Sequence, residues 1–402
     1  MAQIQLRAQR TPARDSRPAA GRSRVRPTYA AVDLDALAHN LHVVTAAAGG
    51  APVLAVVKAD GYGHGAAAVA QRLEAEGAFG FGVALAEEAL ALRALGVRRP
   101  IVILNGVHGA AHAEIVDARL TPVVYDPGEV EAFARAVACR RDERPFGLHL
   151  KIDTGMARLG AFGQTLDATL RAIEQSPGVF LEGVLTHLAT ADTDRDFALE
   201  QVVRFELSLA TIRARGHRPR WVHASNSAAT LMLPEARYDL VRPGIALYGY
   251  GAGPAPTVAR LRPALRVCTE VVALRDLPAG APVGYDCTFT TRRPSRIATL
   301  PVGYADGVRR AASNRGVVLI EGRRCPIAGR VSMDLLSIDV TDAPSVHVGS
   351  EAVLIGEQGG ARIEANEVAS WADTTAYEVL TGVSVRVPRV YLGAAGPSAP
   401  AG

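Results

Sequence analysis

Residues 52–65 read Pro-Val-Leu-Ala-Val-Val-Lys-Ala-Asp-Gly-Tyr-Gly-His-Gly. The six apolar residues at the start predict a short buried strand, and the alternating glycines after Lys58 predict a turn that a ligand can approach closely. Because burial disfavours the charged ammonium form, we expect a lowered pKa and a free amine at Lys58, as a lysine that forms a Schiff base requires. The alternative is a lysine that only reaches from the core into solvent.

From Tyr29 to about Tyr250, short apolar runs alternate with amphipathic patterns. This alternation predicts an α/β fold, a (β/α)8 TIM-like barrel. A doubly wound open sheet is the alternative, but no Gly-x-Gly-x-x-Gly pattern opens a helix after the first strand. The expected strands are residues 52–57, 79–84, 100–105, 122–125, 146–152, 180–186 and 221–223, with Val241 and residues 245–247 marking the last. The expected helices are residues 33–41, with Asp33 as N-cap, 66–76, 86–95, 110–118, 127–140, 164–175 and 196–215.

After a Gly/Pro-rich segment at residues 251–256, the helical periodicity stops and strand patterns separated by turn residues take over. These patterns predict a mostly β C-terminal domain. Its expected strands are residues 265–274, 297–300, 317–320, 334–340 and 352–355, with one helix at residues 365–371. The predicted division is a disordered basic tail at residues 1–27, the barrel at 28–255, the β domain at 256–395 and a disordered tail at 396–402.

The composition is that of an ordinary globular protein, with 402 residues, 49% hydrophobic and 21% charged. The formal net charge of +4 comes from seven arginines in the first 26 residues, so the body of the chain predicts no nucleic-acid-binding face. An organelle transit peptide is an alternative interpretation of that segment. We expect no membrane span and no metal site. The four cysteines form no CxxC pair and indicate reduced thiols in the cytoplasm: Cys139, Cys268, Cys287 and Cys325.

Polar residues end or follow five of the expected strands. Catalytic groups of a parallel barrel gather at those carboxyl-terminal strand ends. Each residue also has an ordinary alternative: a core histidine, a serine N-cap or an arginine in a salt bridge. The five groups are Lys58, Lys151 with Asp153, Thr186 with His187, Asn226 with Ser227, and Arg242.

Residues 57–65 closely resemble the cofactor-lysine motif of the alanine racemases, which are pyridoxal 5′-phosphate (PLP) enzymes with an α/β barrel followed by a β domain. The resemblance runs from about Thr28 to about Tyr391. Ser332 and Phe289 depart from residues common in the family, but neither is an assigned acid or base. The other matching motifs are residues 151–160, 242–245, 283–285, 301–307, 329–334, 377–379 and 386–389.

The resemblance implies that Lys58 and Tyr285 are catalytic and act from opposite sides of the substrate Cα. Arg242 would donate to the pyridine nitrogen and, because arginine keeps its proton, would leave that nitrogen unprotonated, which favours racemisation over transamination. Lys151 matches a lysine that is carbamylated in some members. The implied cofactor-binding residues are Lys58, Tyr62, His187, Asn226, Ser227, Arg242, Gly244, Ile245 and Tyr377, and the implied substrate-binding residues are Arg158, Met333 and Tyr304.

The function that the resemblance implies is alanine racemisation, which interconverts L-alanine and D-alanine by a two-base mechanism and supplies D-alanine for peptidoglycan. It implies a homodimer with shared active sites, in which alanine is the substrate, and the cysteine pattern predicts a cytoplasmic location. One alternative is a racemase of broader or different specificity, for serine or lysine. Two others are a non-catalytic PLP-binding protein built on the barrel alone and a PLP decarboxylase of similar fold.

Overall fold

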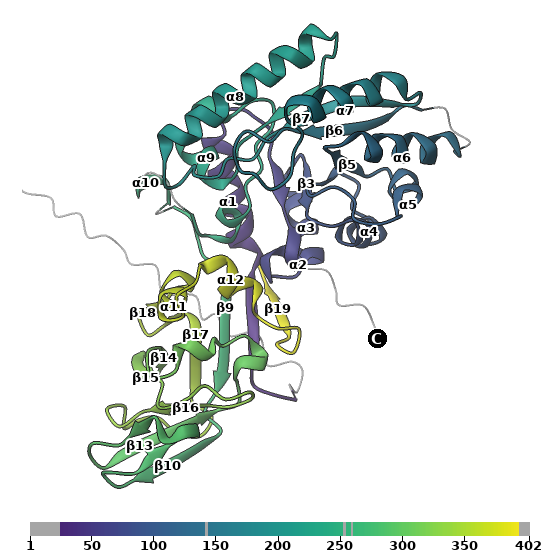
Figure 1. Cartoon of the computed structure of the whole chain (residues 1–402). Coiled ribbons are helices and arrows are strands. Elements are labelled where there is room, and N and C mark those ends of the chain that lie inside the picture. The colour runs from purple at the N-terminus through teal and green to yellow at the C-terminus, as the bar shows by residue number, and fades with distance from the viewer. Residues whose placement is uncertain (1–24, 141–143, 252–254, 259, 394–402) are drawn as a thin grey trace, which may run out of the picture.

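The computed structural model describes residues 25–140, 144–251, 255–258 and 260–393. Apart from residues 25–27, the tails expected at residues 1–27 and 396–402 therefore lie outside the described residues. The chain forms an α/β lobe and a mostly β lobe (Figure 1). The lobes meet near the helices α2 (Lys58–Tyr62) and α12 (Ala376–Thr381) and the strands β1 (Tyr29–Asp33), β9 (Leu265–Glu270) and β19 (Arg389–Leu392). Among the described residues, every helix is too short or too polar to cross a membrane.

The α/β lobe is built on seven parallel strands in the order β2-β3-β4-β5-β6-β7-β8. The strand β4, Ile101–Ile103, is apolar and buried throughout, as expected where both faces of a strand are covered. The strands are β2 Leu54–Val56, β3 Gly80–Val83, β4 Ile101–Ile103, β5 Thr121–Val124, β6 Phe146–Lys151, β7 Val179–Leu185 and β8 Trp221–His223. The helices are α1 Leu34–Ala47, α2 Lys58–Tyr62, α3 Ala66–Ala75, α4 Ala86–Ala94, α5 His112–Asp117, α6 Pro127–Ala138, α7 Gly163–Gln175, α8 Arg195–Ala214, α9 Ser227–Met232 and α10 Ala255–Val258.

An extended segment at residues 239–243 closes the sheet into a barrel. The amide of Arg242 donates to Ser225 O on one side (2.9 Å), and Val241 O accepts from Leu54 N on the other (2.9 Å). The predicted barrel is therefore confirmed, and Val241 marks its last strand position. The expectation for residues 245–247 was wrong, because Ile245–Tyr248 forms a 3-10 helix. Asp33 is the predicted N-cap of α1, since its Oδ1 accepts from the amides of Asp35 and Ala36.

The C-terminal lobe is mostly β, as predicted. A larger sheet follows the order β15-β14-β17-β9-β1-β19, with β18 beside β17, and a smaller one the order β10-β13-β16. The elements are β9 Leu265–Glu270, β10 Ala273–Leu277, β11 Pro282–Val283, β12 Phe289–Thr290, β13 Ser295–Leu300, β14 Val317–Ile320, β15 Arg323–Pro326, β16 Leu336–Asp339, β17 Glu351–Gln358, β18 Ala361–Ile363, α11 Ala365–Trp371, α12 Ala376–Thr381 and β19 Arg389–Leu392.

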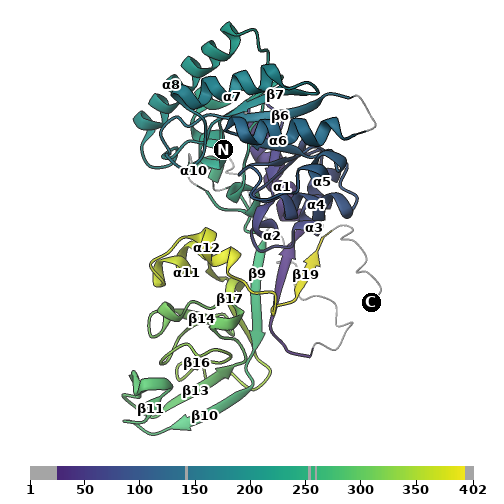
Figure 2. The same cartoon turned by 45° about the vertical axis from the view of Figure 1, so that its right-hand side comes forward.

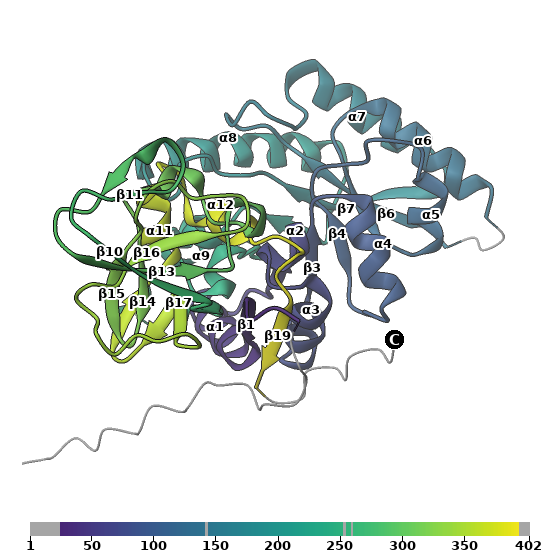
Figure 3. The ribbon, with the colours of Figure 1, turned by 90° about the horizontal axis from the view of Figure 1, so that it is seen from below.

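The strand β1, Tyr29–Asp33, belongs to this C-terminal sheet although it precedes the whole barrel in the chain. It pairs antiparallel with β9 and parallel with β19, so both ends of the described chain lie side by side (Figure 2). Seen from below, the C-terminal lobe lies to one side of the barrel and leaves α4 to α7 uncovered (Figure 3). The domain limits drawn from the sequence, with residue 28 assigned to the barrel, stay a prediction.

Candidate active site

Lys58 follows β2 at the carboxyl-terminal mouth of the barrel. Burial lowers the pKa of Lys58, the charge of Arg158 acts in the same direction, and Glu88 opposes both. The lowered pKa expected from the sequence is therefore found, and its main cause is the expected one. An amine with a lowered pKa has a larger neutral fraction near pH 7 and is a better base and nucleophile.

The turn after Lys58 is left-handed. Ala59, Asp60, Gly61 and Tyr62 all have φ between 52° and 60°, a region that L-residues other than glycine rarely adopt. Hydrogen bonds hold it: the carboxylate of Glu88 accepts from Ala59 N (2.6 Å), and Oδ1 of Asp60 accepts from Ala66 N at the start of α3 (2.8 Å). The direction in which Lys58 leaves the strand is thus set by a tightly bonded turn.

The C-terminal lobe packs directly against this turn through Gly63 and Gly65. A Cβ on Gly63 would overlap Leu380 O, and one on Gly65 would overlap the hydroxyl of Tyr391. The guanidinium of Arg389 donates twice to Gly63 O, at 3.0 and 2.9 Å. These glycines therefore permit the approach that brings α12 beside α2.

One pocket of about 160 Å³ gathers most of the predicted site residues. Four of its side chains are cationic types, whereas Asp192 is its one acidic residue, so its electrostatics favour an anionic ligand. The predicted residues that line it are Lys58, Tyr62, Lys151, Arg158, His187, Asn226, Ser227, Arg242, Gly244, Ile245 and Tyr377.

Arg242 is buried and held by neutral acceptors. Its guanidinium donates to Thr186 O (2.7 Å), Ala224 O (3.0 Å) and Nδ1 of His223 (2.9 Å). The salt bridge considered from the sequence is not found, since none of the ion pairs of the described residues includes Arg242. Burial lowers the pKa of Arg242 to about 9, which still leaves it charged at neutral pH. Burial and the charge of Arg242 hold the pKa of His187 well below its usual range, so His187 is neutral.

The implied phosphate-binding residues form a cradle at one side of the pocket. Ser227 is not the N-cap of α9, because Asn226 takes that role by accepting from Ala229 N (2.9 Å). The hydroxyl of Ser227 accepts from the amides of Gly244 (2.9 Å) and Ala246 (3.2 Å). Hydroxyl and amide groups so gathered can bind phosphate oxygens.

A side chain at Gly244 would fill this cradle, since a Cβ there would overlap the hydroxyl of Tyr62. The rings of Tyr62 and Tyr248 stack at 4.7 Å, and Tyr377 lies 6.0 Å from Tyr62. Burial raises the pKa of Tyr62, so its hydroxyl stays protonated as a hydrogen-bond donor. The pocket therefore fits PLP: a phosphate cradle, a lysine amine and a guanidinium for the ring nitrogen face the same space.

Lys151, at the end of β6, shares the pocket with Arg158. Burial, followed by the charges of Arg158 and Arg242, lowers the pKa of Lys151 to about 8. A lysine with so low a pKa has an amine that can react with carbon dioxide. Carbamylation of Lys151 stays a prediction with this physical basis.

Tyr285, Tyr304 and Met333 are outside the pocket of their own chain. These residues of the C-terminal lobe are 70%, 42% and 52% exposed, and Tyr285 and Tyr304 each begin a short 3-10 helix. The segments of Tyr304 and Met333 pack on one another: Tyr304 N donates to Ser332 O (2.9 Å), and Ala305 N donates to Met333 O (3.0 Å). The chain by itself does not bring the predicted second base to Lys58.

Sequence reasoning missed three residues at this mouth. Asn105 follows β4 and lines the pocket, and the rule that selected the other strand ends could have found it. Asp192 and Glu88 had no such signal, because Asp192 lies in a loop and Glu88 acts from α4 on the turn after Lys58.

The chain is similar to alanine racemases over both lobes. A family described as "Alanine racemase, N-terminal domain" matches residues 32–252, and "Alanine racemase, C-terminal domain" matches residues 264–391. The alanine racemase of Sorangium cellulosum is 47% identical over 380 residues, which cover 91% of this chain and 99% of that protein. That of Symbiobacterium thermophilum is 44% identical over 377 residues, covering 92% and 98%.

Solved structures agree. Alanine racemase from Streptomyces coelicolor superposes with a TM-score of 0.86 at 36% identity, covering 92% of this chain and 99% of that chain. Alanine racemase from Bacillus anthracis with bound L-Ala-P gives a TM-score of 0.85 at 34% identity, covering 92% and 96%. With both domains matched in order, the chain belongs to the alanine racemase family of PLP-dependent isomerases.

Proposed function

We propose that this chain interconverts L-alanine and D-alanine with PLP held in the pocket around Lys58. The observation that carries the proposal is one pocket that combines a lysine amine of lowered pKa, a buried guanidinium and a cradle of hydroxyl and amide groups. Family membership supports the same reaction.

When bound, PLP supplies a carbonyl carbon for the substrate amine and withdraws electrons from the substrate Cα. Lys58 lies on one side and takes or returns the Cα proton at Nζ, helped by its lowered pKa. Arg242 can only donate hydrogen bonds, so a ring nitrogen that accepts from it carries no proton. Arg158 orients the substrate and the second base.

Tyr285 supplies that second base from another copy of the chain. Its 70% exposure and its place outside the pocket of its own chain support a homodimer in which each site combines Lys58 of one subunit with Tyr285 of the other. Tyr304 and Met333 reach the partner's site in the same way. The proposal includes a cytoplasmic location and a supply of D-alanine for peptidoglycan.

Racemisation of both enantiomers of alanine, serine and lysine, with and without added PLP, tests the proposal. Alanine should react fastest, and only when PLP is bound. Much faster turnover of serine or lysine would overturn the assignment of alanine, and release of carbon dioxide would reveal a decarboxylase.

Two variants separate the roles of the bases. Lys58→Ala should lose both racemisation and the yellow colour of the bound cofactor. Tyr285→Phe should keep the colour and lose racemisation. Unchanged racemisation in Tyr285→Phe would contradict the two-base mechanism.

A further inference from the structure

A string of polar side chains crosses the interior of the barrel, where branched apolar side chains are usual. Nη1 of Arg242 lies 2.9 Å from Nδ1 of His223, whose Nε2 lies 3.0 Å from Nδ1 of His149. Nε2 of His149 faces Oε2 of Glu182 at 3.9 Å. The string thus leads from the guanidinium in the cofactor pocket to a carboxylate on β7.

The string has a direction that Arg242 imposes. Because a guanidinium only donates, Nδ1 of His223 must accept, and the proton of a neutral His223 must sit on Nε2. That proton is donated to Nδ1 of His149, so His149 also carries its proton on Nε2, which faces Glu182. Both rings are neutral, since burial lowers the pKa of His149 to about 3 and that of His223 well below its usual range.

Two glycines make room for the string. His149 pairs in register with Gly183, and a Cβ on Gly183 would lie 2.6 Å from the imidazole ring. A Cβ on Gly147 would overlap the carboxylate of Glu182. A register irregularity between Leu148 and His149 accompanies them. The local sequence therefore accommodates these side chains specifically.

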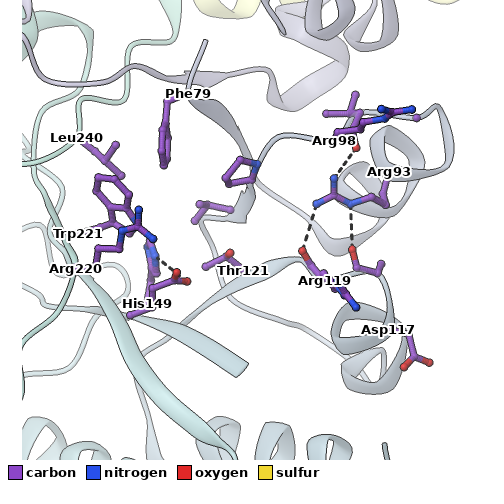
Figure 4. A pocket seen from close by; sticks show the side chains of 16 residues that line it. Phe79, Arg93, Arg98, Asp117, Arg119, Thr121, His149, Arg220, Trp221 and Leu240 are labelled. Carbon is purple, nitrogen blue, oxygen red and sulfur yellow. Dashed lines mark hydrogen bonds and ion pairs between the residues drawn. The ribbon is translucent and has the colours of Figure 1, made fainter. Parts of the chain in front are cut away.

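Glu182 ends the string in a pocket of about 750 Å³ at the amino-terminal mouth of the barrel, whereas Lys58 lies at the carboxyl-terminal mouth. Figure 4 shows His149 among the side chains that line this pocket. Because His149 is neutral, its contact with Glu182 at 3.9 Å joins an N–H group to a carboxylate and is not an ion pair. Burial raises the pKa of Glu182, and the charge of Arg220 partly opposes this. Residues at the starts of the strands line this pocket, among them Phe79, Pro100, Thr121 and Trp221.

We propose that Glu182 is a positioning residue for Arg242 and acts through His149 and His223. The negative charge of the carboxylate, 3.9 Å from Nε2 of His149, favours a proton on that nitrogen. Nδ1 of His149 is then free to accept from His223, and His223 is free to accept from Arg242. Reversal of His149 would set its Nδ1–H against the Nε2–H of His223. Reversal of His223 would remove the acceptor of Nη1 of Arg242, and only the bonds of Nη2 to Thr186 O and Ala224 O would then hold the guanidinium. The inference rests on the proposed function for the role of Arg242 at the ring nitrogen.

Replacement of the Glu182 carboxylate by a hydrogen-bond donor tests whether Glu182 sets the tautomers of His149 and His223. In Glu182→Lys, an ammonium faces Nε2 of His149, which must then accept, so the His149 proton should move to Nδ1. Nitrogen NMR of holoenzyme labelled with ¹⁵N-histidine separates protonated from bare ring nitrogens, and variants at His149 and His223 assign the signals. Wild type should carry both protons on Nε2, and Glu182→Lys should reverse at least His149. Unchanged tautomers in Glu182→Lys would overturn the proposal.

Kinetics give a second readout with a matched control. Glu182→Lys should lower kcat roughly tenfold and leave KM within about twofold, because the string holds the cofactor side of the site and not the substrate. Asp117→Lys makes the same charge change in the same pocket outside the string and should leave both constants within about twofold. An equal fall of kcat in both variants would contradict a role for the string.

If Glu182→Lys does not fold, Glu182→Gln replaces it as the test. Glutamine has the size of glutamate and keeps one oxygen that can accept a hydrogen bond. The variant should retain both tautomers and lower kcat roughly threefold; a kcat equal to wild type would remove any role for the carboxylate charge. The NMR readout does not depend on turnover. Absence of racemisation by wild type would therefore count against the proposed function alone.

Discussion

Lys58, Lys151 and Arg242 illustrate how burial, at the scale of single residues, makes ordinary side chains reactive or selective. Desolvation is the first cause of the lowered pKa at each of them, and neighbouring cations add to it at the two lysines. In each lysine the amine becomes more available, whereas the arginine keeps its charge. The same buried environment thus makes the two lysine amines more often neutral and leaves the arginine positively charged.

Carbamylation of Lys151 is a prediction that its pKa of about 8 makes testable. At pH 7 about a tenth of such amines are neutral, and carbon dioxide adds to the neutral form. Added ¹³C-bicarbonate should give a carbamate signal in ¹³C NMR of the wild type that grows between pH 7 and about 8.5. The signal should be missing in Lys151→Gln; an undiminished signal there would place the reaction elsewhere.

The turn between β2 and α3 shows how one element ties the two lobes together. Its left-handed residues, together with Gly63 and Gly65, present a surface to Leu380, Arg389 and Tyr391. Substitution of these glycines should therefore loosen the joint between the lobes as well as strain the local backbone.

Gly63→Ala should lower the free energy of unfolding by about 2–4 kcal/mol, since it adds a clash with Leu380 O to the penalty for positive φ. Gly77→Ala is the control, because Gly77 has φ of +90° and no heavy atom within 4 Å of its ideal Cβ. It should lose only about 1–2 kcal/mol. Urea unfolding measures both, and equal losses would argue against the clash.

Periodic elements could be predicted from sequence because their signal is local. The helix expected at residues 365–371 is α11, and the barrel strands before Lys58 and Lys151 lie where apolar runs placed them. The strand expected at residues 265–274 is instead two strands in different sheets, broken at Val271 and Val272. Such a break depends on strand partners that are far apart in sequence. The pairing of β1 with β19 depends on distant partners in the same way.

Some residues of the candidate site could be predicted from the sequence and others could not. Strand-end residues such as Lys58 and Arg242 could be located because a barrel gathers them at one mouth. The inward histidines His149 and His223 could not be given a role, since their partners come from other strands and their tautomers depend on Arg242.

At the scale of the whole molecule, Lys58 and Tyr285 cannot meet within one chain as described, so two inactive variants should complement each other. After Lys58→Ala and Tyr285→Phe are coexpressed, a mixed dimer holds one site with both residues intact. Random assembly should restore racemisation at roughly a quarter of the sites. No recovery, with mixed dimers shown by mass spectrometry, would exclude shared sites.

Acid should destabilise the fold through its buried neutral histidines. Burial lowers the pKa of His64 to about 4, while an unfolded histidine titrates near 6.5. Between these values the unfolded chain binds more protons, so stability falls as pH falls, by about 2 kcal/mol for His64 from pH 6.5 to 5. Urea unfolding of His64→Gln should show a weaker pH dependence than wild type. The control His42→Gln, at an exposed position, should show the same pH dependence of unfolding as wild type.

The pairing of β1 with β19 also bears on synthesis of the polypeptide. Residues 29–33 are synthesised before the barrel strands, but residues 389–392 only after all the other strands of the described chain. The nascent protein can close its barrel long before its other sheet gains that neighbour. The edge of this sheet beside β1 therefore stays open until residues 389–392 have been made, even when every catalytic side chain of the barrel is already present.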